Sequence, residues 1–332
     1  MNNKTWVVVL NWNNGRDTVD CLQSILDSGT QDIEGVVVCD NDSHDGSVET
    51  IKNWAESNEM VLPEYNWEHD DFDLVSGDEA TRVDSGLEFV LINTGSNLGF
   101  AGGNNVGIRY VQQKCKYDFI FLLNNDALVV ENTVKMLVTR CVETGAGMCG
   151  CKVVYHFNPT RVQAWGGASF QPPLGRATHL GAGVDIDVQP SVENIERQLD
   201  YILGAALMIS KPCLEDIGLM EESYFLYYEE VDWAVRARRA GFSLAYANDA
   251  VVFHKEGGTI GSSSIKGQRS LLSEYYLIKS RILFTRRQYP LYLPSVCLFT
   301  LAQLSRNLFR GDFKRCMVGL KAMFGISLET EI

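Results

Sequence analysis

The sequence predicts an α/β protein with a mostly parallel, twisted sheet, flanking helices and a C-terminal helical tail. Short apolar runs end abruptly at polar or turn-forming residues, as do strands buried on both faces of a parallel sheet. Segments with helical spacing of apolar residues separate these runs, and such alternation produces right-handed parallel units. The 332 residues are 45% hydrophobic and 21% charged, the composition of a soluble globular protein with one large or two ordinary domains.

The first part of the chain contains four expected strands, each leading toward a helix. We expect strands at 6–10, 35–40, 89–92 and 117–123. Helices are expected at 18–28 and 133–144, together with one that starts near residue 48 and one that includes residues 108 and 111. One segment breaks the alternation, because residues 62–88 carry nine acidic side chains and a single basic one, Arg82. These acids have no metal-ligand spacing, so we expect a solvated surface insertion.

The second part contains further strands and an irregular segment. Apolar runs at 149–155 and 201–209 predict strands, and short strands are expected at 243–246 and 250–253. One helix is expected to begin at Pro212, and a second one is expected to end at Gly241. Residues 156–198 are rich in Gly and Pro. We expect them to form loops and short antiparallel strands that cover the ligand edge of the sheet on the side of a second substrate.

Charge is distributed unevenly along the chain. The net charge is −13, yet residues 264–332 hold eleven Lys and Arg against four Asp and Glu, so the tail is +7 and residues 1–263 are −20. An acidic body argues against nucleic acid as a partner, because the phosphate backbone attracts basic surfaces. The basic tail indicates contact with an anionic surface, most simply a membrane.

The tail has two segments of helical character. Residues 271–284 are amphipathic, whereas 289–309 are apolar but interrupted by Pro294, Thr300, Gln303 and Ser305. This span is too short and too polar for a helix that crosses a membrane. Six basic residues lie between positions 286 and 315, so we predict a helix at a membrane surface. The alternative is a helical pair packed on the preceding domain.

Cysteine usage and the N-terminus predict the compartment. The nine cysteines form no Cys-x-x-Cys motif and lie mostly in apolar runs, which is typical of reduced core thiols and not of a structural zinc site. The chain enters a strand pattern at Trp6 without a basic and apolar leader, so no secretory signal is expected. The expected location is cytoplasmic, with peripheral contact at the cytoplasmic face of a membrane.

A polar triplet, Asn124-Asn125-Asp126, ends the apolar run at 119–123. Ligands bind at the carboxyl ends of strands in open parallel sheets. The carboxylate and carboxamide oxygens of the triplet suit a hard divalent cation that carries phosphate. The alternative is a turn that caps the next helix. His254 closes another strand. A lone histidine is usually a hydrogen-bonded side chain, but a neutral imidazole is also a suitable partner for Asp126 on one cation.

The acidic cluster at 229–232 opens a helix. Carboxylates in a first turn stabilise the helix dipole, which is a sufficient structural role. Asp232 has Arg236 one turn later as an ion-pair partner, whereas Glu230 has alanine there. An unpaired acid flanked by aromatic residues has its pKa raised by desolvation, which suits a general base. Glu230 is therefore the first candidate for a base and Asp232 the second.

A glycine-rich stretch, from Asn93 to Asn105, follows the strand at 89–92. Its glycines let the backbone approach a ligand, and the N-terminus of the following helix favours an anion. The stretch contains neither G-x-G-x-x-G nor a Walker loop, so it does not predict a dinucleotide site or a P-loop.

Five motifs occur in one order: Asn11-Trp-Asn13, Asp40 to Ser47, Asn97 to Asn105, Leu123 to Asp126 and Tyr228 to Trp233. Through them, residues 5–256 resemble glycosyltransferase family 2, particularly its bacterial and archaeal rhamnosyltransferase-like members. The resemblance implies a GT-A fold over residues 1–262, with residues 263–332 as the tail. It also implies a nucleotide-sugar donor, a divalent metal (Mg²⁺ or Mn²⁺) and inversion at the anomeric carbon.

The same resemblance implies roles for single residues. Asp40 would contact the N3–H of a pyrimidine base, and the nucleotide would be lined by Asn11, Asn13, Asn97, Gly102, Gly103 and Asn105. The donor sugar would lie near Asn124, Asn125, Gly204 and Ala205. The metal would be held by Asp126 and His254, and Glu230 would be the catalytic base, with Asp232 as the alternative. Asn124 replaces the first aspartate of the family's Asp-x-Asp motif, so Asp126 is expected to be the only charged member of the triplet on the metal.

These roles predict an inverting transferase that acts by metal-assisted single displacement. The expected reaction moves L-rhamnose from dTDP-rhamnose to a hydroxyl of a glycan or lipid-linked glycan, in the synthesis of a cell-envelope polysaccharide. Two alternatives remain: another donor, such as a UDP-hexose or UDP-galactofuranose, and a catalytically inactive protein that binds nucleotide sugars. A sugar-nucleotide pyrophosphorylase is disfavoured, because the turn after the first strand has only Arg16 as a basic residue.

Overall fold

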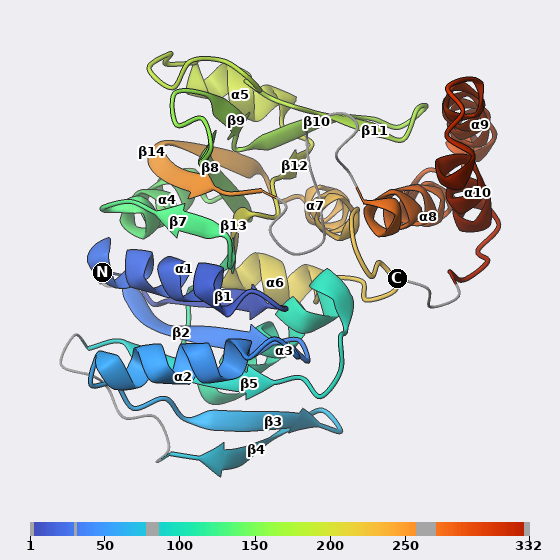
Figure 1. The fold of residues 1–332 in the computed structure, drawn as a ribbon. Helices are drawn as coiled ribbons and strands as arrows, with labels where there is room; N and C mark the ends of the chain where they lie inside the picture. The colour runs from blue at the N-terminus through green and yellow to red at the C-terminus, as the bar shows by residue number, and fades with distance from the viewer. Residues whose placement is uncertain (1–2, 30–31, 78–85, 257–269, 329–332) are drawn as a thin grey trace.

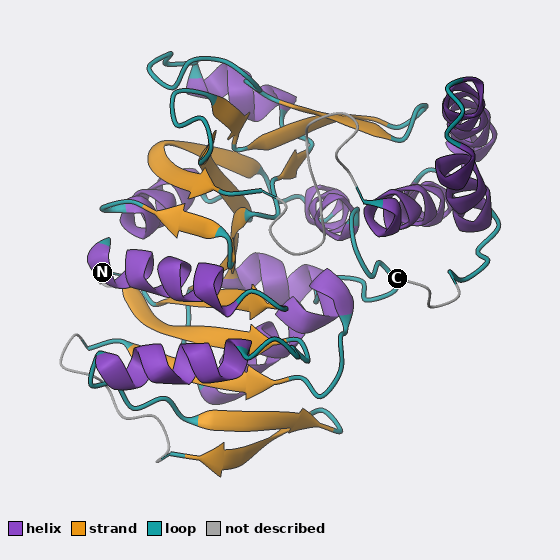
Figure 2. Ribbon diagram, viewed as in Figure 1, coloured by secondary structure: helices purple, strands orange, loops and turns teal. Residues whose placement is uncertain are grey.

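The computed structural model describes residues 3–29, 32–77, 86–256 and 270–328. Within them, a sheet of eleven strands runs through the molecule and helices cover both of its faces (Figures 1 and 2). In spatial order its strands are β4 (Asp71–Ser76), β3 (Glu64–Glu68), β5 (Glu88–Asn93), β2 (Ile33–Asp40), β1 (Thr5–Asn11), β6 (Phe119–Asn124), β13 (Ala206–Ser210), β8 (Met148–Tyr155), β14 (Leu244–His254) and β7 (Ala127–Val129), with β9 (Val162–Trp165) paired to β8.

The main sheet is mixed, with five parallel and five antiparallel pairs of neighbouring strands among the described residues. β3, β5, β2, β1 and β6 pair in parallel, as do β8 and β14, whereas β13 is antiparallel to both of its neighbours. The predicted α/β class is confirmed. The carboxyl ends of β1, β2 and β6 meet at one edge, where Asn11 lies opposite Asp40, and Leu10 lies opposite Asn124.

Two layers of helices bury the two faces of this sheet. α1 (Gly15–Asp27), α2 (Ser47–Ser57) and α4 (Thr133–Thr144) cover one face, and α3 (Gly99–Lys114), α6 (Lys211–Ile217) and α7 (Glu229–Arg239) cover the other. Leu22 of α1 and Ile108 of α3 are fully buried in the two cores. Burial of each such side chain contributes roughly 1.5–3 kcal/mol to folding.

Residues 62–77 of the acidic segment form an edge of the sheet with four of their five acidic side chains exposed, and the origin of this segment as an insertion stays a prediction. β3 and β4 form an antiparallel hairpin, and β3 pairs with β5. Tyr65 and Phe72 are buried against Tyr110 of α3, while Asp71 and Asp73 are exposed on the other face. This alternation is that of a strand with one solvated face. The rest of the segment, 78–85, lies outside the described residues.

Two predicted strand boundaries in the second half are wrong. The run at 201–209 divides, because β12 (Tyr201–Ile202) joins a three-stranded sheet with β10 (Gly167–Gln171) and β11 (Arg176–His179), while β13 joins the main sheet. The run from 243 to 253 is one strand, β14, with an irregular register between Ala247 and Val251. The segment 156–198 contains the expected short antiparallel strands and, in addition, α5 (Val192–Gln198).

The tail forms three helices, α8 (Leu271–Gln288), α9 (Leu293–Phe309) and α10 (Phe313–Met323), with a short helix η1 (Pro290–Tyr292) before α9. α8 packs on the main body, since Phe284 is buried in its core and the Ser280 hydroxyl donates to the Leu226 carbonyl at 2.8 Å. α9 and α10 pack on the other side of α8 around a small core that includes Leu304. The predicted boundary at 262/263 lies outside the described residues.

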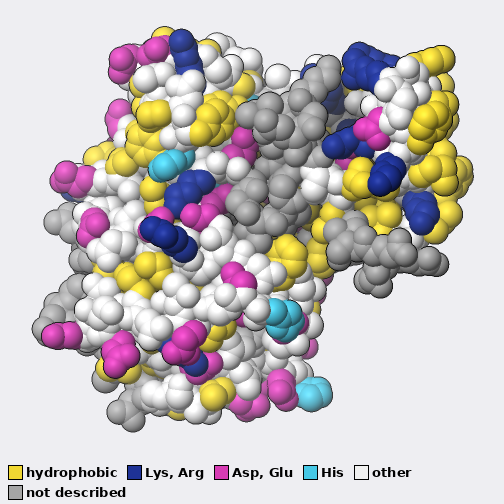
Figure 3. All heavy atoms as spheres, in the orientation of Figure 1, with side chains coloured by type: hydrophobic (Ala, Val, Ile, Leu, Met, Phe, Trp, Pro, Cys, Tyr) yellow, Lys and Arg dark blue, Asp and Glu magenta, His cyan; other side chains and the backbone are white. Residues whose placement is uncertain are grey.

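The surface of the tail differs from that of the body. In Figure 3, Lys and Arg side chains lie among hydrophobic side chains over the region of α9 and α10, whereas acidic side chains are spread over the body. Within the described residues, no helix combines the length and apolar character required to cross a membrane.

Candidate active site

Asp40 is fixed at the carboxyl edge by its neighbours on β1 and in the following loop. The Asn11 carboxamide donates to Oδ1 of Asp40 at 2.7 Å, and the Ser43 amide donates to Oδ2 at 2.9 Å. Asn11 in turn accepts from the Thr18 hydroxyl at 2.6 Å. Asp40 is 3% exposed, so its carboxylate has one fixed orientation. The carboxamide of Asn11 positions Asp40, and both lie where the sequence predicted a nucleotide.

Two further asparagines connect the loops at this edge. Asn13 accepts from the His44 amide at 2.9 Å. Asn97 accepts from the Asn41 carboxamide at 3.0 Å, and Asn41 itself accepts from the Leu98 amide at 3.0 Å. The loops after β1, β2 and β5 are therefore bound to one another. Sequence reasoning missed Asn41, although its position directly after Asp40 at a strand end was an available signal.

The predicted glycine-rich loop is wrong in its boundary, because α3 already begins at Gly99. Gly102 and Gly103 lie in the first turns of this helix. A Cβ atom on Gly103 would lie 2.4 Å from Cδ1 of Leu10, and one on Gly102 would lie 2.7 Å from Cβ of Leu98. These glycines allow α3 to pack closely on β1 and on the preceding loop. Their observed role is close packing, and their predicted approach to a ligand stays a prediction.

Asn105, which the sequence predicted to line the nucleotide, has structural partners in this fold. Its side chain is fully buried and donates to the Met220 carbonyl at 2.8 Å and to Glu222 at 2.9 Å, while it accepts from the Met220 amide at 3.1 Å. These three bonds fix the loop that precedes α7. The carboxamide therefore faces that loop, and its contact with a nucleotide stays a prediction.

The polar triplet and His254 converge through the pairing of β7 with β14. His254 lies opposite Ala127 in this pair, and its Nε2 atom is 3.1 Å from Oδ1 of Asp126. The Asn124 carboxamide nitrogen is 3.5 Å from the same Nε2, and the Asn124 amide donates to the Ala205 carbonyl at 3.0 Å. Asn125 instead donates to the Thr18 hydroxyl at 3.0 Å, so its side chain faces α1.

The His254 ring has a defined tautomer. Nδ1 lies 2.9 Å from Oε1 of Gln163, and this carbonyl oxygen only accepts, so Nδ1 carries a proton. Gln163 is held by its own bond to Glu256 at 3.0 Å. Burial lowers the pKa of His254, but the charge and hydrogen bond of Asp126 outweigh this, and the pKa is raised. No signal in the sequence indicated Gln163, which lies on β9.

The chemistry of Asp126 and His254 fits a divalent cation. With Nδ1–H held by Gln163, Nε2 of His254 and Oδ1 of Asp126 face each other, and a cation bound by the neutral ring would take the place of a proton between these two atoms. Within the described residues, no group of three or more His, Cys, Asp or Glu side chains could hold a metal. A cation at this place would therefore depend on further oxygen ligands from a substrate and water, as Mg²⁺ often does.

Glu230 lies in the first turn of α7, beside Gly204. A Cβ atom on Gly204 would lie 3.8 Å from Cγ of Glu230 and 3.6 Å from the Phe100 ring. Oε2 of Glu230 is shielded from solvent and has no hydrogen-bond partner among the described residues. Burial raises the pKa of Glu230 to about 7. The neighbouring Glu229 is also buried, and burial together with the charge of Glu230 raises its pKa well above its usual range.

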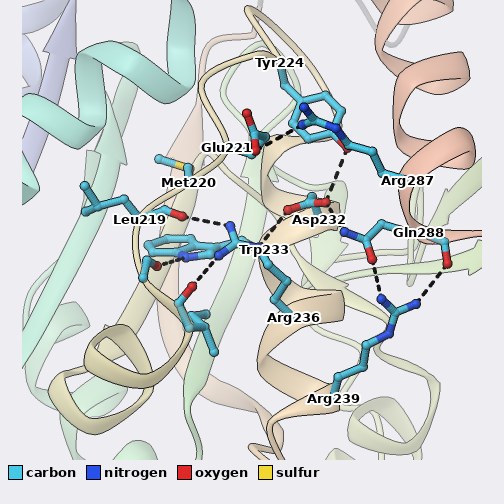
Figure 4. A network of polar contacts seen from close by, with 12 residues as sticks. Leu219, Met220, Glu221, Tyr224, Asp232, Trp233, Arg236, Arg239, Arg287 and Gln288 are labelled. Atoms are coloured by element: carbon cyan, nitrogen blue, oxygen red, sulfur yellow. Dashed lines mark hydrogen bonds and ion pairs between the residues drawn. The ribbon is translucent and has the colours of Figure 1, made fainter.

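The Asp232 side chain is held in a network of polar contacts (Figure 4). It is 2% exposed, accepts from Nε of Arg236 at 2.8 Å, and accepts from the Gln288 carboxamide at 2.5 Å. Arg236 also donates to the carbonyls of Ile217 and Leu219. The predicted ion pair with Arg236 is confirmed. Because both carboxylate oxygens of Asp232 are occupied, the structure favours Glu230 over Asp232 as the base.

The fold is that of the GT-A glycosyltransferases, as predicted. The mannosyltransferase PcManGT from Pyrobaculum calidifontis, solved in complex with GDP-Man and Mn²⁺, superposes with a TM-score of 0.54 at 14% identity, over 100% of this chain and 89% of that one. This likeness shows the fold alone.

Sequence similarity points to the same class of protein. The chain is 27% identical over 165 residues to the low-salt glycan biosynthesis hexosyltransferase Agl10 of Haloferax volcanii, which covers 50% of this chain and 51% of that protein. It is 25% identical over 210 residues to the dTDP-rhamnosyl transferase RfbF of Shigella flexneri, over 61% of this chain and 65% of that protein. The match thus spans about half the length of the first relative. No family model matches the chain. The predicted resemblance to glycosyltransferases, rhamnosyltransferases included, is confirmed.

Proposed function

We propose that this protein is an inverting glycosyltransferase that moves a sugar from a nucleoside-diphosphate donor to a hydroxyl of a glycan or lipid-linked glycan. The observation that carries the proposal is the environment of Glu230. Its shielded Oε2 has no partner among the described residues, its pKa is raised to about 7 by burial, and it lies beside Gly204. A base with this pKa is ionised in useful amounts at neutral pH and is basic enough to accept a hydroxyl proton.

The donor is proposed to lie along the carboxyl edge. Asp40, held by Asn11 and Ser43, accepts from the N–H of a pyrimidine base. The Asn124 amide is bonded to the Ala205 carbonyl, and Gly204 lies next to Glu230, so the sugar end of the donor is placed between Asn124 and Glu230. The acceptor hydroxyl then approaches from the side of Glu230, which removes its proton as the bond to the anomeric carbon forms.

The leaving diphosphate is proposed to lie near Asp126 and His254. A bound divalent cation would supply positive charge to the departing diphosphate oxygens. Asp126 contributes the only carboxylate of the triplet, His254 contributes Nε2, and Gln163 keeps the proton on Nδ1. Asn124 remains a neutral neighbour. That PcManGT was solved with Mn²⁺ supports the choice of Mn²⁺ or Mg²⁺.

For the donor we propose dTDP-rhamnose, giving L-rhamnose as the transferred sugar. The similarity to the dTDP-rhamnosyl transferase RfbF supports this choice, and Asp40 suits a pyrimidine base. A UDP-hexose or UDP-galactofuranose would present the same base edge, so these are the competing donors.

The test is a panel of dTDP-, UDP- and GDP-sugars with Mn²⁺ or Mg²⁺, measured by thermal shift and by release of nucleoside diphosphate. We expect stabilisation by dTDP-rhamnose that depends on the metal, together with slow release of dTDP. Asp126→Asn should abolish the metal-dependent part of the thermal shift, whereas the exposed Asp73→Asn should not change it. Binding of a donor without any turnover, even with candidate acceptors, would contradict the proposed activity.

A further inference from the structure

Exposed apolar side chains are concentrated on the outer part of the tail. Among the described residues, ten of the sixteen exposed large hydrophobic side chains lie between positions 291 and 326, and Phe309 is 89% exposed. The other nine are Leu291, Tyr292, Leu298, Leu301, Leu308, Phe313, Met317, Phe324 and Ile326. Exposed apolar side chains gathered in one region, and not scattered singly, mark an interaction surface.

These side chains form a second apolar face on α9. Val296, Thr300 and Leu304 are buried toward α8 and α10, with the spacing of one helix face. Leu298, Leu301 and Leu308 are exposed and also share a face. An amphipathic helix on a protein surface normally has one apolar face and a polar opposite face. α9 therefore has an apolar face that the rest of the described chain does not cover.

Basic side chains without acidic partners lie among these apolar ones. Arg306, Arg310 and Lys314 are exposed, and none makes an ion pair with another described residue. By contrast, Arg287 pairs with Glu221 at 3.1 Å. In sequence, the three unpaired cations alternate with the exposed Leu308, Phe309 and Phe313 around the turn between α9 and α10. This is the mixture that recognises an anionic, partly apolar surface.

We infer that the outer face of α9 and α10 docks on an anionic lipid surface. The exposed Leu and Phe side chains enter the boundary between headgroups and acyl chains, and the cations contact lipid phosphates, as in interfacial helices. The charge of the chain fits this occupant: described residues 270–328 hold nine Lys and Arg and two Asp and Glu, a balance of +7, while residues 1–263 are −20. The anionic surface attracts the tail and repels the body, which orients the molecule.

The docking face is fixed to the body by specific contacts. The Ser295 hydroxyl, at the start of α9, donates to the Pro173 carbonyl at 2.8 Å, in the segment between β10 and β11. Arg281 of α8 donates to the Tyr228 hydroxyl at 3.3 Å, directly before α7. A docked tail therefore holds β10, β11 and α7 at a set distance from the lipid surface.

The experiment is flotation of the full chain with vesicles of phosphatidylcholine alone or with added phosphatidylglycerol, at low and high salt. We expect binding only to the anionic vesicles, weakened by salt. The triple variant Arg306→Gln/Arg310→Gln/Lys314→Gln should reduce binding at least tenfold, as should Phe309→Ser/Phe313→Ser/Phe324→Ser. Matched controls are Lys114→Gln/Lys116→Gln/Lys135→Gln and Val75→Ser/Val142→Ser/Phe157→Ser, which alter exposed residues of the body and should bind as the wild type does.

Three outcomes would overturn the inference. The first is absence of binding to any vesicle, and the second is equal binding to both vesicle types without salt dependence. The third is a concentration-dependent dimer, seen by light scattering, that both tail variants abolish, because the face would then bind a second copy of the chain. Circular dichroism of each variant verifies that α9 and α10 remain folded.

Discussion

Glu229 and Glu230 are adjacent, but the structure predicts different consequences for their removal. Burial and the charge of Glu230 raise the pKa of Glu229 well above its usual range, which favours the neutral form that a glutamine resembles. Glu230, with a pKa of about 7, is partly ionised and can accept a proton. We expect Glu230→Gln to lower transfer by roughly 10²–10⁴-fold, the usual contribution of a general base. Glu229→Gln, measured in the same assay, should stay within a few-fold of the wild type. Equal loss in both variants would contradict the assignment.

The buried Glu230 carboxyl also predicts a pH dependence of stability. Its ordinary pKa is 4.5 and its folded-state pKa is about 7, so between these values the folded state retains a proton that the unfolded state releases. The contribution of this group to stability therefore falls as pH rises through that window, by about 3 kcal/mol. Glu230→Gln should have the stability of the wild type near pH 4.5 and be more stable at pH 8, by urea denaturation.

The exposed Glu56→Gln is the control for that measurement and should change stability by a few tenths of a kcal/mol at either pH. In the wild type, kcat/KM should rise with pH through about 7, because the base must be deprotonated. A stability difference that is independent of pH would contradict the buried ionisation of Glu230.

Also at the scale of residues, the sequence ranked Glu230 before Asp232 as the candidate base, because Arg236 lies one helical turn after Asp232 and can pair with it. Helical spacing makes such pairs visible without a structure. The other partner of Asp232, Gln288, lies 56 positions away on α8, and Gln163 lies 91 positions before His254. Contacts of this kind depend on tertiary packing, so no local pattern indicates them.

At the scale of elements, strand ends were predicted better than helix starts. Asp40, Asn124 and His254 follow apolar runs that have to be strands, and parallel register brings Asn11 and Asp40 to one edge. The start of α3 was misplaced, because its first turns are rich in glycine, which usually indicates a loop. Here the glycines are required by the close approach of α3 to β1. The break at Gly204 was missed because apolar residues continue on both sides of it.

Asn105 ends the stretch that the sequence predicted as a loop, but it lies within α3, so its substitution tests the role of this part of the helix. Asn105→Ala removes two buried hydrogen bonds and one partly buried hydrogen bond between α3 and the loop before α7, so we expect a loss of about 2–4 kcal/mol in the free energy of unfolding. Affinity for the nucleotide, measured at a temperature where the variant is folded, should change less than threefold. Gln113→Ala, an exposed change on the same helix, should leave both quantities unaltered. A stable variant that binds the nucleotide weakly would support the nucleotide contact that the sequence predicted for Asn105.

At the scale of the whole molecule, α8 lies between the body with the proposed active site and the helices with the proposed docking face. One side of α8 is buried against the body through Phe284, and the other supports the small core with α9 and α10. The amphipathic pattern of the tail predicted helices and their basic character. It left open whether they pack or stay exposed, because an apolar face has the same sequence whether protein or lipid covers it. In the structure, α8 packs on the body, whereas α9 and α10 retain a face that the described residues do not cover.

This arrangement predicts that lipid docking and chemistry can be separated. Phe309, Phe313 and Phe324 are exposed on the outer helices, whereas Glu230 lies on α7, on the opposite side of α8. We expect the triple Phe→Ser variant to release nucleoside diphosphate from a donor sugar within twofold of the wild-type rate in solution, because no contact of the site is altered. With anionic vesicles present, only the wild type should float with the lipid. If this variant remains folded but hydrolyses the donor more than tenfold more slowly, the outer helices contribute to the site itself, and the division of the molecule at α8 is wrong.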